Sequence, residues 1–221
     1  IQLFKDFADI RTEGTRIFAQ AGASLAKIAA EALRNSLTGF EFAAGIPGTL
    51  GGACIMNAGA YGGEMKDVLE SVTVLDGQGD IRVLPREELD MGYRTSRAAR
   101  EGYIVLEAVI ALEPGDESKI REKLEDLKER RTSKQPLEYP SAGSTFKRPE
   151  GYFAGKLIQD AGLRGLRVGD AMVSEKHCGF VINCGSATAA DVDRLIRQVQ
   201  ERVRENSGVT LEPEVKRLGE F

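Results

Sequence analysis

The sequence feature that most constrains the fold is a change of character at Pro114-Gly115. The segment before this dipeptide is rich in apolar, strand-like runs. The segment after it, residues 116–131, is strongly charged, with apolar residues at helical spacing. A Pro-Gly pair interrupts regular structure, and a charged amphipathic helix is typical of a solvent-exposed connection. We therefore predict two domains, residues 1–114 and 115–221, with the charged helix opening the second.

Strand and helix patterns alternate irregularly along both parts. Alternating and β-branched runs predict strands at residues 1–4, 15–20, 69–75, 81–84, 104–112, 179–183 and 209–218. Periodic apolar residues and capping signals predict helices at residues 25–34, 116–131, 154–161 and 188–206. Residues 136–146 have the character of a loop. Because no regular strand-helix-strand repeat is present, we expect an α+β fold rather than a doubly wound parallel sheet.

Composition excludes several classes of protein. The chain has 221 residues and a formal net charge of -4, which argues against general nucleic-acid binding. No apolar run approaches the roughly 20 residues of a membrane span, and we expect no membrane partner. Three cysteines without a CxxC pair, and His177 as the sole histidine, favour neither a disulfide framework nor a metal site. A reducing cytoplasm is the expected compartment.

The strongest local signal is the glycine-rich stretch over residues 45–63, GIPGTLGGACIMNAGAYGG. Pro47 suits the first turn of a helix, and Gly48, Gly51 and Gly52 would let the backbone approach a ligand closely. Their N–H groups could hold an anion such as a pyrophosphate. Tight packing of a helix against a strand would also need small residues here. From glycine content alone, the two interpretations are evenly balanced.

Three further motifs contain residues suited to chemistry. Ser144 lies in SAGSTFKRP, where a hydroxyl among cationic and apolar neighbours could donate a proton. Arg94 lies in MGYRTS, and its planar guanidinium suits a carboxylate or phosphate. Glu212 and Glu214 lie on one face of the strand predicted at LEPEV. In isolation, a turn serine, a surface ion pair and an exposed strand face would each be the more common interpretation.

Taken together, the motifs are far more specific. The ordered set GIPGTLGGACIMNAGAYG, GYRTS, RRTSKQP, AGSTFKRP, IQDAGLRG and LEPEVKRLG resembles the UDP-N-acetylenolpyruvoylglucosamine reductase (MurB) family, from near residue 15 to the C-terminus. The resemblance implies the second lobe of a two-lobed FAD-binding domain, followed by an α+β substrate-binding domain.

The resemblance also implies an activity. The family reduces UDP-N-acetylglucosamine enolpyruvate to UDP-N-acetylmuramate, a precursor of bacterial peptidoglycan, with FAD as cofactor and NADPH as reductant. A hydride from the flavin adds to C3 of the enolpyruvyl group, and the resulting enolate is protonated at C2. Such an enzyme is a cytoplasmic flavoprotein oxidoreductase that serves cell-wall biogenesis and, through it, cell shape and division.

Residue roles carry over motif by motif. Ser144 resembles the family's proton donor, and Arg94 and Glu214 resemble the pair that stabilises the enolate. An ionised Glu214 would repel an enolate, so we expect it to be at least partly protonated in the substrate complex. The residues expected to bind substrate are Tyr93, Lys134 and Lys147. Those expected to line the cofactor are Gly45, Ile46, Pro47, Gly48, Thr49, Gly51, Gly52, Asn57, Gly59, Ala60, Tyr61 and Gly62.

The chain departs from the family pattern in three ways. The GGGSN-like segment of the family's N-terminal FAD lobe is absent, so we expect Ile1 to follow a missing upstream segment. The stretch between Phe146 and Glu214 resembles the shorter C-terminal form, which lacks a tyrosine-bearing lid loop. Arg148 stands where the longer form has an asparagine.

Two alternatives stay open beside the reductase. A non-catalytic module that binds a nucleotide sugar would show saturable binding of a UDP-sugar without flavin or turnover. A different oxidoreductase with the same flavin fold is disfavoured, because it would not need Arg94, Ser144 and Glu214 together.

Overall fold

The computed structural model describes residue 3 and residues 5–219, and it divides into two compact units, Ile1–Arg130 and Arg131–Phe221. We call them unit 1 and unit 2. The strand expected at residues 1–4 falls largely outside the described residues. Across the part of the chain that is described, no helix is both long and apolar enough to cross a lipid bilayer.

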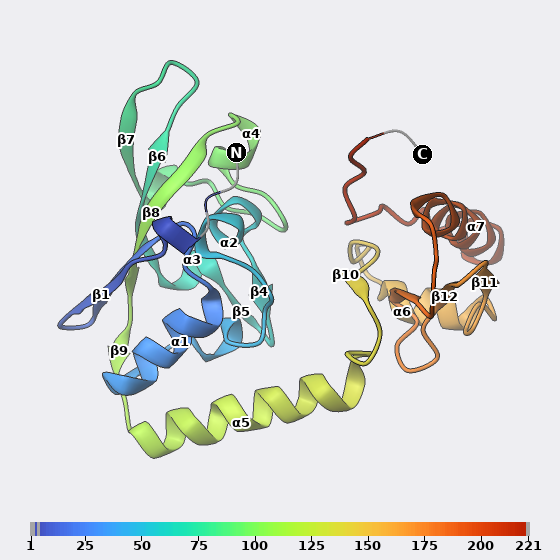
Figure 1. The fold of residues 1–221 in the computed structure, drawn as a ribbon, viewed down its shortest axis with the longest axis horizontal. Helices are drawn as coiled ribbons and strands as arrows, with labels where there is room; N and C mark the ends of the chain where they lie inside the picture. Colours follow the sequence, from blue (N-terminus) through green and yellow to red (C-terminus); the bar gives the residue numbers. More distant parts are fainter. Residues whose placement is uncertain (1–2, 4, 220–221) are drawn as a thin grey trace. The chain divides into compact units, whose positions relative to one another are not determined.

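Unit 1 is built on a five-stranded antiparallel sheet with the order β1-β2-β8-β6-β7 (Figure 1). Its strands are β1 (Ile10–Glu13), β2 (Arg16–Gln20), β6 (Leu69–Leu75), β7 (Ile81–Pro85) and β8 (Ile104–Ala111). Helices α1 (Leu25–Arg34) and α2 (Leu50–Met56) contact this sheet. Apolar residues from the strands and both helices, such as Ile17, Ile28, Leu50 and Ile110, form one continuous core.

Short elements complete unit 1. Two-residue strands pair as β3 (Leu37–Thr38) with β9 (Glu113–Pro114), and as β4 (Gly59–Ala60) with β5 (Gly63–Glu64). The remaining helices are α3 (Met65–Val68) and α4 (Arg97–Arg100), with 3-10 turns at Lys5–Phe7, Glu41–Ala43 and Arg86–Glu88.

The charged helix α5 runs from Glu117 to Lys134, and the division between the units falls near its end rather than at residues 114 and 115. The physical reason lies in its first turns. Ile120 is buried, and Lys123 bonds Glu41 of unit 1. These contacts attach most of the helix to the unit that precedes it in the chain.

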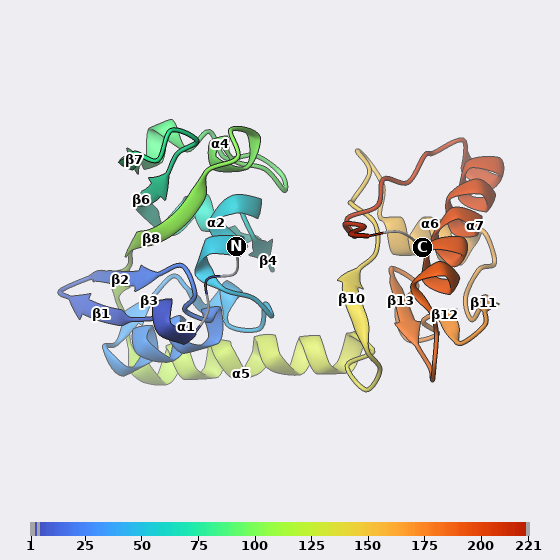
Figure 2. The ribbon, with the colours of Figure 1, turned by 45° about the horizontal axis from the view of Figure 1, so that its top comes forward.

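Unit 2 combines a four-stranded sheet, with the order β10-β13-β12-β11, with helices α6 (Ala154–Asp160) and α7 (Ala189–Ser207) (Figure 2). The strands are β10 (Ser141–Ser144), β11 (Arg167–Val168), β12 (Ala171–Val173) and β13 (Phe180–Asn183). The sequence predicts an apolar stripe on α7 made of Val192, Leu195, Ile196, Val199 and Val203. The last four are buried, and Val192 is half-buried. Thr188 and Asp191 form a capping box at the start of α7, and Gly208 closes it in a left-handed conformation.

Most sequence predictions of elements are confirmed, and two are wrong. The helix at 25–34 has the predicted bounds and the predicted N-cap, Ser24. The loop predicted over 136–146 contains β10. The strand predicted over 209–218 is reduced to an isolated bridge between Pro213 and Phe146. Leu211 is buried and Glu212 is exposed, but residues 213–215 are all half-buried, so the predicted alternation does not continue along the segment.

Candidate functional site

The glycine-rich stretch occupies α2, the β4-β5 hairpin and their connections in unit 1. Some of its glycines are required by packing. A Cβ on Gly51 would lie 2.9 Å from the Ala21 Cβ, and a Cβ on Gly63 would lie 2.7 Å from the Phe42 ring. At these positions the packing interpretation holds, because real Cβ atoms do not tolerate such contacts.

Other glycines of the stretch face open space. A Cβ on Gly48, Gly52 or Gly62 would meet no atom within 4 Å, and all three residues are exposed. Gly62 has a φ of 89°, a conformation that side chains disfavour. At each of these three positions the main chain is open to close approach by a ligand.

The prediction that backbone N–H groups at the start of α2 could hold an anion is wrong for Gly51. Its N–H donates to the Ala21 carbonyl at 2.9 Å, and the Leu50 N–H donates to the Ala23 carbonyl at 2.9 Å. Pro47 lies before the helix, whose N-cap is Thr49. Backbone carbonyls of unit 1 therefore take the bonds that a phosphate would need from these two amides.

Asn57 is the C-cap of α2 and has a left-handed conformation with φ 42°. Only 1% of this residue is exposed to solvent. Its Nδ2 donates to Glu64 Oε2 at 2.7 Å and to the Gly92 carbonyl at 3.1 Å, and its Oδ1 accepts from the Lys66 N–H at 3.0 Å. The side chain of this predicted cofactor residue is thus occupied by contacts within the protein.

Arg94 lies in a tight turn closed by reciprocal backbone bonds between Gly92 and Thr95, at 3.1 and 3.3 Å. The residue is half-buried with φ 54°, and its guanidinium lies 5.2 Å from the ring centroid of the exposed Tyr93. The pKa of Glu64 is lowered, first by the hydrogen bond from Lys66 and further by Asn57 and the Arg94 charge. Arg94 therefore stands in the field of an ionised carboxylate.

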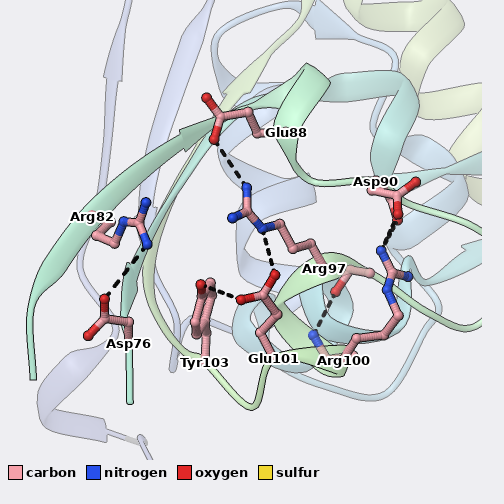
Figure 3. A network of polar contacts seen from close by, with 10 residues as sticks. Asp76, Arg82, Glu88, Asp90, Arg97, Arg100, Glu101 and Tyr103 are labelled. Atoms are coloured by element: carbon pink, nitrogen blue, oxygen red, sulfur yellow. Dashed lines mark hydrogen bonds and ion pairs between the residues drawn. The ribbon is translucent and has the colours of Figure 1, made fainter. Parts of the chain in front are cut away.

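A polar network flanks this turn (Figure 3). Arg97 pairs with Glu88 at 3.3 Å and with Glu101 at 3.0 Å. Arg100 bonds the Asp90 carboxylate, the Asp90 carbonyl and the Thr95 hydroxyl. Sequence reasoning singled out neither Arg97, which follows directly after the GYRTS motif, nor Arg100, which lies three residues further along.

In unit 2, Ser144 is the exposed last residue of β10, opposite Phe180 of β13. The chain beyond it pairs with the C-terminal segment. Glu214 N–H donates to the Thr145 carbonyl at 2.9 Å, and Lys147 N–H donates to the Glu212 carbonyl at 2.9 Å. This pairing places the backbone of half-buried Glu214 opposite Thr145, the residue that follows Ser144, although 70 positions separate Ser144 and Glu214 in sequence.

Two of the predicted substrate residues, Lys134 and Lys147, are cations in unit 2. Lys134 is exposed at the end of α5, and half-buried Lys147 forms an ion pair with Glu212. Tyr93 and Arg94 belong to unit 1. The structure thus unites Ser144, Glu214 and Lys147 in one unit, and Arg94, Tyr93 and the glycine-rich stretch in the other.

His177, kept outside the predicted catalytic set, has a packing role. Its Nδ1 accepts from the Gly179 N–H at 3.1 Å, and its ring lies edge-on to Phe180. Burial lowers the pKa of the imidazole, which favours the neutral form.

Comparisons with known proteins agree with these features. Residues 135–218 match the family described as UDP-N-acetylenolpyruvoylglucosamine reductase, C-terminal domain, and residues 1–84 match an FAD binding domain. A protein named UDP-N-acetylenolpyruvoylglucosamine reductase from Agathobacter rectalis is 62% identical, over 93% of this chain and 65% of the relative. A protein of the same name from Lachnoclostridium phytofermentans is 61% identical, over 94% of this chain and 67% of the relative. The crystal structure of the enzyme of that name from Thermus caldophilus is 41% identical, with a TM-score of 0.81, over 90% of this chain and 71% of that one. The chain thus spans about two thirds of the length of these relatives.

Proposed function

Because this chain belongs to the UDP-N-acetylenolpyruvoylglucosamine reductase family, we propose that it serves the NADPH- and FAD-dependent reduction of UDP-N-acetylglucosamine enolpyruvate to UDP-N-acetylmuramate. The observation that carries the proposal is the backbone pairing of the Ser144 and Glu214 segments. This pairing supports the proposal because it links two chain segments, remote in sequence, that carry residues the reaction would need near one reacting carbon.

The exposed glycine backbone of unit 1 fits the cofactor. Gly48, Gly52 and Gly62 leave open space where side chains would stand, so the main chain could lie against a flavin. Bound FAD would supply the hydride, taken from NADPH, that reduces the enolpyruvyl double bond. The protein's own part is to hold the cofactor and substrate and to manage charge and protons.

Ser144 is the proposed proton donor. An enolate is basic enough to take a proton from a neutral hydroxyl, so the position of the serine matters more than its acidity. Arg94 would stabilise the negative charge that grows on the enolate and the neighbouring carboxylate, and this stabilisation is larger in the transition state than in the ground state. Glu214 is the proposed partner of Arg94 at the enolate.

The lysines are the proposed contacts for the nucleotide-sugar diphosphate. Lys134 is exposed, whereas Lys147 is paired with Glu212. Binding of a diphosphate at Lys147 would therefore exchange one anionic partner for another. Tyr93, exposed beside Arg94, completes the proposed substrate set.

The proposal includes peptidoglycan precursor synthesis in the cytoplasm, and through it a part in cell shape and division. A reducing compartment is supported by the three cysteines, which are all free thiols. Burial raises the pKa of the Cys54 thiol to about 12, so this cysteine stays protonated and unreactive.

The first experiment is an absorption spectrum of the protein after FAD addition and desalting, followed by stopped-flow measurement of the two half-reactions. We expect Ser144→Ala to reduce oxidation of the reduced flavin by the enolpyruvyl substrate at least 100-fold, while flavin reduction by NADPH is unchanged. Ser141→Ala, in the same strand, is the matched control and should leave both half-reactions intact.

Loss of both half-reactions in a folded Ser144→Ala protein would contradict the assignment of Ser144. Saturable binding of a UDP-sugar without flavin retention or turnover would instead support the alternative, a non-catalytic UDP-sugar-binding fragment.

A further inference from the structure

We propose that Asn57 is a positioning residue for Arg94, which fixes the Gly92–Thr95 turn against the glycine-rich stretch. The functional part of this inference rests on the proposed role of Arg94, whereas its structural part does not. It gives the buried Asn57 side chain a task distinct from contact with the cofactor.

The argument begins with the bonds that Asn57 makes. Its amide group donates to the Gly92 carbonyl, inside the turn, and to Glu64, and it accepts from the Lys66 N–H. One fully buried side chain thus ties three segments together: the end of α2, the β5-α3 junction and the turn that holds Arg94. A buried amide with all these bonds satisfied has one stable orientation, so it defines the position of the Gly92 carbonyl.

The backbone of the turn is strained at Arg94. Two reciprocal backbone bonds close the turn, and Arg94 has φ 54°, a strained value for a residue with a long side chain. Ser96 adds a second link to α2, since its buried hydroxyl donates to the Ile55 carbonyl at 2.9 Å. Arg100 bonds Asp90, before the turn (Figure 3). It also bonds the Thr95 hydroxyl, at the end of the turn.

Asn57 also arranges the charges around Arg94. Its Nδ2 and Lys66 Nζ both reach Glu64 Oε2, at 2.7 and 3.0 Å. Glu64 is thereby held as an anion close enough to Arg94 for the Arg94 charge to lower the Glu64 pKa. Without Asn57, both the backbone position of Arg94 and the orientation of its neighbouring anion would be less well defined. A displacement of about 1 Å in a catalytic group can cost about 100-fold in rate.

The test is Asn57→Gly, because glycine accepts the left-handed conformation and only the side-chain bonds are lost. Hydrogen exchange of peptides covering residues 90–96 should become at least 10-fold faster, while exchange in β6 and β8 stays at the wild-type rate. In FAD-loaded protein, we expect kcat for oxidation by the enolpyruvyl substrate to fall 10- to 100-fold, with flavin reduction by NADPH unchanged. Combining the variant with Arg94→Ala should add little further loss.

Two variants complete the design. Ser36→Gly, at another left-handed position with φ 53°, is the matched control and should change neither exchange at 90–96 nor kcat. Asn57→Asp keeps the size and one acceptor but loses the donors, so it should reproduce the Asn57→Gly effects if the latter protein folds poorly. Wild-type exchange at 90–96 in both Asn57 variants would overturn the proposal. The proposal would also fail if Asn57→Gly lowered kcat by the same factor in the wild-type and in the Arg94→Ala protein. If the wild-type protein itself failed to reduce the substrate, the proposed function would fail, and the exchange rates alone would decide the role of Asn57.

Discussion

At the residue scale, Glu41 shows how a buried carboxylate can be stabilised as an anion. It is 3% exposed and accepts from the Thr38 hydroxyl at 2.6 Å, the Gly39 N–H at 3.0 Å and Lys123 Nζ at 3.2 Å. Burial alone would raise the pKa of this carboxyl, but the hydrogen bonds outweigh it and the pKa is lowered. Because Lys123 lies on α5, this carboxylate also fastens the long helix to unit 1.

This lowered pKa predicts a dependence of stability on pH. A carboxyl whose folded pKa lies below its unfolded value of about 4.5 contributes fully above that value, and the contribution is lost as pH falls through the folded pKa. We expect Glu41→Gln to lower the free energy of unfolding by about 1–3 kcal/mol at pH 7. The difference from wild type should shrink below about pH 4.5. Urea unfolding at a series of pH values measures it.

The exposed Glu113→Gln is the control, and it should change stability by less than about 0.5 kcal/mol. A difference between Glu41→Gln and wild type that stayed constant from pH 7 to pH 3.5 would contradict the assignment of this carboxylate as the titrating group.

At the scale of the element, α2 distinguishes the two interpretations of its glycines, which are tight packing against a strand and close approach of a ligand. Gly51 and Gly52 are neighbours in sequence but face different surroundings: a Cβ would meet Ala21 at 2.9 Å from Gly51 and nothing within 4 Å from Gly52. Packing therefore explains Gly51, whereas it places no restriction on a side chain at Gly52, which agrees with the proposed access of a ligand there.

These neighbours form a matched pair of variants. We expect Gly51→Ala to destabilise the flavin-free protein by about 1–3 kcal/mol through overpacking. Gly52→Ala should leave it unchanged or stabilise it by up to about 1 kcal/mol, because alanine favours the helix. Flavin affinity, measured by fluorescence titration, should fall at least 10-fold in Gly52→Ala. Unchanged affinity there would remove Gly52 from the cofactor surface.

Local sequence signals predicted the elements that local physics determines. The α7 helix has Thr188 as its N-cap, an apolar stripe and Gly208 at its C-terminal end. Each of these signals depends on interactions between residues a few positions apart in the sequence. The strand expected at 209–218 did not form because Leu211 packs into the core of unit 2 while the segment pairs only through an isolated bridge, and neither contact can be read from the local pattern. β12 has only three residues, too few to show a period of two. Likewise, the bond from Asn57 to Gly92 spans 35 positions, and no local pattern predicts it.

At the scale of the whole molecule, each unit has its own apolar core. The core of unit 1 draws on strands and helices between Ile17 and Leu112, and that of unit 2 on residues between Phe146 and Leu211. A compact region with a separate core can open as a separate cooperative unit. The change of sequence character at Pro114-Gly115 predicted a division into two units. The boundary between them is determined by the contacts of α5 with unit 1, and these contacts cannot be read from composition.

Two core truncations test this independence. Leu195 in α7 and Leu50 in α2 are each 0% exposed, and truncation to alanine should cost about 2–5 kcal/mol at either position. Native-state hydrogen exchange reports stability region by region, so each variant shows which amides share the loss. We expect Leu195→Ala to speed exchange in α7 and β13 and to leave β6 and β8 unchanged, and Leu50→Ala to do the reverse. If Leu195→Ala lowered protection equally in all four elements, the chain would unfold as one cooperative body, and the two cores would be parts of a single folding unit.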